Sequence, residues 1–202
     1  MKKILLLAAL ALALPTAMFA GSSVDFTNSG GTLSGSSSGL SLTGSVLIAI
    51  NGLNGGGLIT GNNLGSVSFT TGALTSGSLQ MGGTFATGGS FTLTGNGTSG
   101  VPSGTIFSGT FSTPATWTLV TLANGTHNYT LTGTVAGTFG SGYSSEGVTV
   151  QLTINTGKGY FNGSTTISSG DTSIVVPEPG SLSLLGTGLL GLAGVVRRKL
   201  KG

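Results

Sequence analysis

Val148-Thr149-Val150-Gln151-Leu152-Thr153-Ile154 alternates without a break between apolar and polar side chains. Successive side chains of a β-strand point to opposite faces of the sheet, so this stretch predicts a half-buried strand whose four apolar residues share one face. Tyr129-Thr-Leu-Thr-Gly-Thr-Val135 has the same pattern, and Gly140-Ser-Gly142 lies between the two stretches. The block from Tyr129 to Ile154 is therefore expected to form a long hairpin.

Shorter alternations recur upstream, and Asn-Gly pairs that favour tight turns separate many of them. No helical segment of ordinary length is visible between residues 21 and 176. These features predict an all-β fold, an antiparallel β-sandwich of about ten short strands. Three Gly-Thr-Phe segments at unequal spacing leave a β-solenoid as the alternative: residues 83–85, 109–111 and 137–139.

The N-terminus has the three parts of a secretory signal peptide. Lys2 and Lys3 precede an apolar stretch at residues 4–14, which Pro15 ends, and Ala20 suits the position before the cut. Residues 1–20 are therefore expected to be removed. Residues 21–39 are rich in Gly, Ser and Thr and are predicted to form a flexible arm, and residues 40–175 the all-β domain.

The basic character of the chain, with a pI near 9.5, comes almost entirely from its two ends. Six of the seven Lys and Arg residues lie there, and between residues 21 and 176 only Lys158 faces the acids Asp25, Glu146 and Asp171. No basic patch for phosphate contacts is left, so nucleic acid is not an expected partner. The chain has no cysteine, so no disulfide contributes to its stability.

Groups for catalysis are scarce. His127 is the one histidine of the chain, and a hydrolytic triad would need it beside Asp25 or Asp171. No spacing pairs the carboxylates or forms a metal-ligand cluster, so no cofactor or metal is expected. His127 follows Asn124-Gly125 and is predicted to be an exposed turn residue. A non-enzymatic protein is therefore favoured, and a secreted hydrolase using His127 is a remote alternative.

Aromatic side chains are the remaining binding groups. Trp117, Tyr129, Tyr143 and Tyr160 could stack on sugar rings at a sheet face, or they could anchor the core. A carbohydrate-binding or adhesive surface module is the alternative function that they support.

The last 27 residues, 176–202, contain three parts in a fixed order. Val176-Pro177-Glu178-Pro179 is a stiff break, because each proline fixes φ and removes a backbone donor. The uncharged segment 182–196 follows and is predicted to be a single transmembrane helix, which at 1.5 Å per residue spans roughly 24 Å with its flanking serine. Arg197, Arg198 and Lys199 then form a basic end that stops translocation.

This tail resembles the PEP-CTERM sorting signal in its Pro-Glu-Pro motif, Leu/Gly-rich segment and Arg-Arg end. The resemblance implies a substrate of an exosortase, which cuts near the motif, and export of the chain across the inner membrane by the Sec machinery. It also implies a transient membrane anchor, a final place at the cell surface or in the extracellular matrix, and association with exopolysaccharide in a biofilm. It covers about an eighth of the chain and implies no activity for the β domain.

Overall fold

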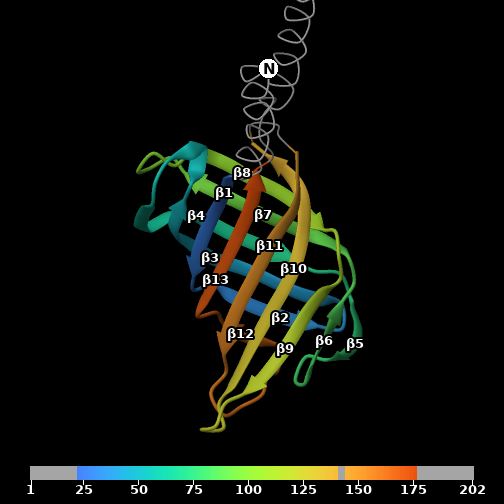
Figure 1. Cartoon of the computed structure of the whole chain (residues 1–202). Coiled ribbons are helices and arrows are strands. Elements are labelled where there is room, and N and C mark those ends of the chain that lie inside the picture. The colour runs from blue at the N-terminus through green and yellow to red at the C-terminus, as the bar shows by residue number, and fades with distance from the viewer. Residues whose placement is uncertain (1–21, 141–143, 177–202) are drawn as a thin grey trace, which may run out of the picture. The chain divides into compact units, whose positions relative to one another are not determined.

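The structure is a computed structural model that describes residues 22–140 and 144–176. They contain a single 3₁₀ turn, η2 (Leu53–Gly55), and thirteen strands (Figure 1). The strands are β1 (Ser22–Ser29), β2 (Thr32–Ser36), β3 (Gly39–Asn51), β4 (Ile59–Thr70), β5 (Leu74–Ser78), β6 (Gly82–Phe85), β7 (Gly88–Asn96), β8 (Ser103–Phe111), β9 (Ala115–Thr121), β10 (His127–Phe139), β11 (Ser144–Asn155), β12 (Ser164–Thr166) and β13 (Ser169–Val176).

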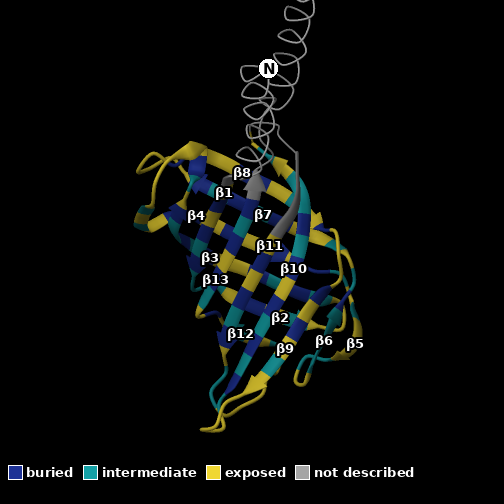
Figure 2. Ribbon diagram, in the orientation of Figure 1, coloured by how far each residue is buried: buried dark blue, intermediate teal, exposed yellow. Residues whose placement is uncertain are grey.

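The hairpin expected from the alternating sequence is confirmed. β10 and β11 pair antiparallel from Asn128 opposite Asn155 to Thr138 opposite Ser144, with one irregularity after Val135. Leu131 and Leu152 face each other on the buried side, and the threonines between the apolar residues lie on the outer side. Alternation in the sequence thus becomes alternation of burial along the strand, as the banding of the strands in Figure 2 shows.

The sheet closes on itself. Its hydrogen-bonded order runs β11-β13-β1-β3-β4-β7-β8-β10, and β10 also pairs with β11, so these eight strands form a ring. Each strand pair with a defined register is antiparallel. In Figure 1, β1, β13, β11, β10 and β9 lie in front, and β7 and β8 cross behind them.

Two long strands carry the sheet from one layer to the other. The first half of β10 pairs with β9 and its second half with β8, while β11 follows its other edge. Likewise, β3 pairs first with β2 and then with β1. The register of β3 with β4 shifts between Leu42 and Ser45, and that of β10 with β11 shifts after Val135, each near the point where the partner on the other edge changes. Such irregularities bend a strand and increase its twist.

The closed sheet surrounds a core rich in phenylalanine. The rings of Phe69 and Phe91 stack at 6.5 Å between centroids, and Phe111 meets Phe69 edge to face at 6.0 Å. Gly133 makes room for this packing, because a Cβ there would lie 2.7 Å from the Phe111 ring. The fold is therefore held by sheet closure over buried aromatic rings.

The structure corrects three expectations about the fold. The flexible arm predicted for residues 21–39 is wrong from residue 22 onward: β1 and β2 belong to the sheet, and Phe26 and Leu33 are buried. The part of the chain that the structure describes has thirteen strands rather than about ten, and β3 and β10 each run for 13 residues. The solenoid alternative also fails, because neighbouring strands include the first and the last of the chain instead of successive repeats.

The predicted signal peptide and the predicted transmembrane segment 182–196 lie outside the described residues. Within residues 22–140 and 144–176, no helix has the length and apolar character needed to cross a membrane. Ser23–Val175 form a compact unit of their own, and this unit is the β domain.

Candidate functional site: an acidic groove across the first and last strands

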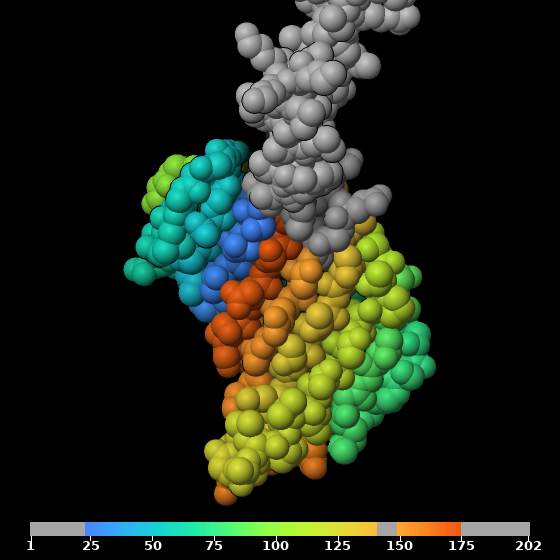
Figure 3. Space-filling model, in the orientation of Figure 1, coloured from blue at the N-terminus to red at the C-terminus, as the bar shows by residue number. Residues whose placement is uncertain are grey.

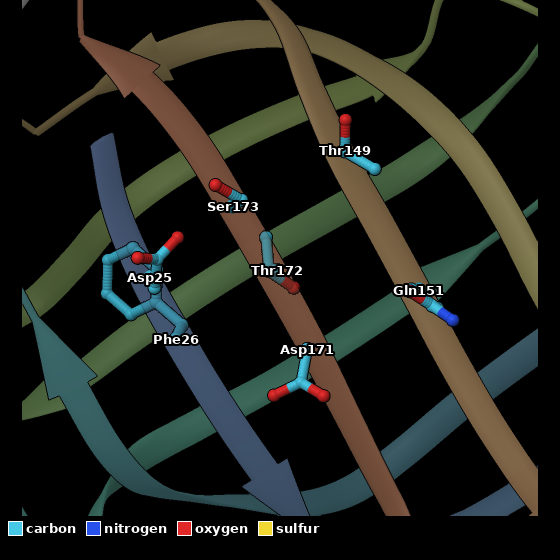
Figure 4. A pocket seen from close by; sticks show the side chains of 7 residues that line it. All are labelled: Asp25, Phe26, Thr149, Gln151, Asp171, Thr172 and Ser173. Atoms are coloured by element: carbon cyan, nitrogen blue, oxygen red, sulfur yellow. The ribbon is translucent and has the colours of Figure 1, made fainter. Parts of the chain in front are cut away.

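A shallow groove of about 270 Å³ lies on the outer face of β1, β13 and β11 (Figure 4). Closure of the sheet creates it, since β13 lies between β11 and β1 and so brings the two ends of the domain together. Asp25 comes from β1 and Asp171 from β13, and Gln151 of β11 pairs with Asp171. Thr149, which pairs with Ser173, lies further along the same face, and the groove walls also include Phe26 and Thr172.

The groove is rich in hydrogen-bonding oxygen atoms. Asp25 and Asp171 are both exposed, and the Thr27 hydroxyl donates a hydrogen bond of 3.0 Å to Asp171 Oδ1. Gln151 adds an amide that can donate or accept. The two carboxylates, the amide and the neighbouring hydroxyls therefore suit a neutral ligand with several hydroxyl groups, or a cationic one.

The groove contains two ionisable side chains, those of Asp25 and Asp171. Two further depressions of about 320 and 300 Å³ lie near Leu53 and near Ser66, and both are lined entirely by uncharged residues. Among the described residues, no group of three or more His, Cys, Asp or Glu side chains could hold a metal ion. The groove thus offers polar contacts to a ligand, and its described residues do not form a metal site.

The sequence does not predict that Asp25 and Asp171 line the same groove. The two residues lie 146 positions apart, and no spacing along the chain relates them. They lie close together because the first strand, β1, and the last strand, β13, are neighbours in the sheet.

His127 is not the exposed turn residue that the sequence predicted. It begins β10 and is only 7% exposed, because its ring lies between the strand ends and the loop after β11. Its Nδ1 lies 3.0 Å from the Thr121 hydroxyl, and the Tyr160 ring stacks on it with centroids 4.3 Å apart. Among the described residues, no hydrogen bond joins His127 to a carboxylate, so the arrangement required for a Ser-His-Asp triad is not formed there.

Two of the four aromatic residues proposed as sugar contacts are in the core. Trp117 is 1% exposed and Tyr129 is fully buried, and their rings stack at 5.0 Å. The indole Nε1 of Trp117 donates to the Leu79 carbonyl at 2.9 Å. The Tyr129 hydroxyl donates to the Gln80 carbonyl at 2.6 Å and accepts from the Phe161 amide at 3.1 Å. Neither ring can contact a surface ligand, which corrects that prediction.

Tyr160 is the exception, since it is 49% exposed in the loop between β11 and β12, where its ring stacks on His127 at the start of β10. Its loop is held by backbone hydrogen bonds from His127 to Gly157 and from Thr156 to His127. Tyr143 lies outside the described residues. Of the three aromatic residues that the structure describes among the predicted sugar contacts, Tyr160 is the one at the surface.

The outer surface around the groove is uncharged over a wide area. Threonines of neighbouring strands face each other across β9, β10 and β11, as in Thr118–Thr130 and Thr130–Thr153. In the space-filling view, β10, β11 and β13 form a continuous surface (Figure 3). Threonines that face each other on neighbouring strands stabilise the solvent-exposed face of a sheet. This face therefore offers few charged groups to an ionic partner.

The sorting residues are mostly outside the described part of the chain. Ala20, Pro177, Glu178, Pro179, Arg197, Arg198 and Lys199 are all in this group. Val176 is the last residue of β13, so the tail begins where the sheet ends.

Comparison with known proteins concerns this same tail. A family model described as the PEP-CTERM protein-sorting motif matches residues 175–199. No curated protein matches the chain, and no solved structure matches it. The protein therefore carries a C-terminal PEP-CTERM protein-sorting motif, joined directly to the last strand of its β domain.

Proposed function

We propose that the protein is an exported, non-enzymatic component of the cell surface or extracellular matrix. The sorting motif at residues 175–199 is the observation that carries this proposal. An exosortase cuts the chain near Pro177-Glu178-Pro179, after the Sec machinery has moved it across the inner membrane. The released part is the closed β domain, and it resides among exopolysaccharide in a biofilm.

The chemistry of the β domain supports a role without catalysis. The one histidine is buried against Tyr160 and a threonine hydroxyl, and the outer surface consists largely of uncharged hydroxyl groups. Such a surface is compatible with a hydrated neutral polymer, and the closed sheet resists unfolding without disulfides.

The test is a double Pro177→Ala and Pro179→Ala variant, expressed in a host that contains an exosortase. We expect the wild type to appear outside the membrane fraction in a shortened form, and the variant to stay in the membrane fraction at full length. A matched control is Pro102→Ala, which also removes a proline but lies far from the motif in sequence. Equal shortening of the double variant and the wild type would refute the role of the motif.

A carbohydrate-binding module is the second candidate, and the acidic groove favours it. Asp25, Asp171 and Gln151 offer acceptors and a donor on one face, as recognition of sugar hydroxyls requires. Binding on a glycan array that is lost in Asp171→Asn and kept in Lys158→Gln would support this candidate. Absence of binding by the wild type would count against it.

A further inference from the structure

The sorting motif and the folded domain share residues. The match to the motif begins at residue 175, whereas β13 extends to Val176. The last two residues of the strand are thus the first two of the motif, and no spacer separates the sheet from Pro177. A protease that cuts near Pro177 therefore approaches a chain that is still part of the sheet.

β13 is held on both of its edges. It lies between β11 and β1, and its register with β11 runs from Ser169 opposite Thr153 to Ser173 opposite Thr149. The side chains of Ile174 and Thr172 are 0% and 2% exposed. Gly170 packs so closely on Asn28 that a Cβ would come within 2.7 Å of the amide oxygen. A central strand with these contacts does not fray as an edge strand or a loop would.

Proteases act on extended chain that can leave its own structure. Cutting concentrates at exposed, poorly ordered segments, and within folded regions it follows the population of locally opened states. The pairing of β13 with β11 runs to Ser173 and the strand itself runs to Val176, so the residues just before Pro177 belong to the sheet. They are less available to a second partner while β13 is docked.

We propose that β13 competes with the sorting protease for the residues on the amino side of Pro177, so that cleavage is favoured while β13 is undocked. The cut falls at or beyond Val176, which leaves β13 complete in the product. Hydrolysis there consumes one water molecule, leaves a new carboxyl group on the β domain and gives the released segment a new amino group. This inference rests on the proposed processing by an exosortase.

The arrangement of the chain supports this order of events. β13 is the last strand of the domain, and its neighbour β1 is the first, so the ring closes only when β13 arrives. The arrows of β1 and β13 run in opposite directions in Figures 1 and 4, so β1 begins and β13 ends at the same end of the sheet. Docking of β13 and cutting of the motif thus concern the same end of the domain and the same few residues.

The experiment follows cleavage of the full chain by pulse-chase labelling in cells that contain the exosortase. One variant carries a short Gly/Ser spacer between Val176 and Pro177, which separates the motif from the strand. Its control carries the same spacer after Gly57, in an exposed turn where nothing lies within 4 Å of an added Cβ. We expect the first insertion to raise the rate of cleavage severalfold and the second to leave it unchanged.

A pair of substitutions tests the same competition without changing the length. Ile174→Ala weakens docking of the end of β13. Ile154→Ala removes the same type of buried side chain from β11, one residue beyond the other end of its pairing with β13. We expect faster cleavage of Ile174→Ala than of Ile154→Ala. An unchanged or slower rate in the Val176 spacer variant would overturn the competition and leave the proposed function intact. A wild type that is never cleaved would instead refute the proposed function itself.

Discussion

At the residue scale, Tyr129 links three distant parts of the chain. Its hydroxyl donates to the Gln80 carbonyl before β6 and accepts from the Phe161 amide after β11, and its ring stacks on Trp117. Each of these contacts closes the sheet over its core, so the ring has a structural role. The exposed Tyr160 has no comparable set of contacts beyond the His127 stack.

Tyr129→Phe should therefore destabilise the domain while Tyr160→Phe should not. The first substitution leaves a buried amide at Phe161 and a carbonyl at Gln80 without the hydroxyl, a loss of about 1–3 kcal/mol in the free energy of unfolding. The second removes a hydroxyl from a half-exposed ring. Urea unfolding followed by tryptophan fluorescence measures both, and equal stability of the two variants would contradict the structural role of Tyr129.

Trp117→Ala should lower the free energy of unfolding by about 3–5 kcal/mol, because the side chain is 1% exposed and its removal leaves a cavity in the core. A loss of glycan binding in this variant would thus report unfolding and not a lost sugar contact. Near-wild-type stability in urea would show that the indole is not part of the core.

At the element scale, β1 is the strand whose place in the sheet its composition conceals. Its Gly, Ser and Thr neighbours have the composition of a loose segment, yet Val24 and Phe26 are buried and the strand pairs with β3. The sheet needs β1 because it joins β13 to β3 and so completes the ring. Removing it would expose the edges of two strands at once.

Deletion of residues 22–29 should therefore abolish cooperative folding, whereas an arm could be removed without effect. A short glycine insertion after Gly57 is the control, since that turn is exposed. Amide hydrogen exchange distinguishes the two outcomes: protection in β3 and β11 should disappear in the deletion and persist in the insertion. Retained protection in the deletion would mean that β1 is dispensable.

Ile174→Ala and Ile154→Ala should destabilise the domain by similar amounts, about 2–5 kcal/mol each, because both side chains are fully buried. Equal loss of stability makes them a matched pair for the cleavage experiment. If their unfolding midpoints in urea differ widely, the two variants are not a matched pair, and the two spacer variants alone decide the competition.

The elements that could be predicted are those with a local signal. Period-two alternation predicts the β10–β11 hairpin. The same alternation places Tyr129 and Leu131 on one face of the strand, and both side chains are buried. The β1–β13 contact has no such signal, because the partner of a strand in a closed sheet is chosen by packing over the whole domain. The groove between Asp25 and Asp171 depends on that contact, so it could not be predicted either.

At the scale of the whole molecule, closure depends on residues at both ends of the domain. β13 is made last and pairs with both β1 and β11, so contacts distant in sequence must form before the ring is complete. Sheets that depend on such contacts fold slowly, because the chain loses the entropy of loop closure before the stabilising contacts between distant strands have formed. Folding of the domain therefore waits for the residues that lie next to the sorting motif.

A chain that ends at residue 168 should consequently fail to form the closed sheet, while a chain that ends at residue 176 should form it. The shorter chain lacks β13 and leaves β1 and β11 without a neighbour on one side. Resistance to a broad-specificity protease is the measurement, with rapid digestion expected for the shorter chain alone. Equal resistance of the two chains would contradict the need for β13.

The intact mass of the mature protein recovered from producing cells shows whether the chain is exported and cut at the sorting motif. We predict a mature chain that begins near residue 21 and ends at or shortly after Val176, close to Pro177-Glu178-Pro179, with β13 complete. A mass that still includes Lys201 would show that the tail remains a permanent part of the protein. A C-terminus before residue 174 would show that the protease removes part of the sheet.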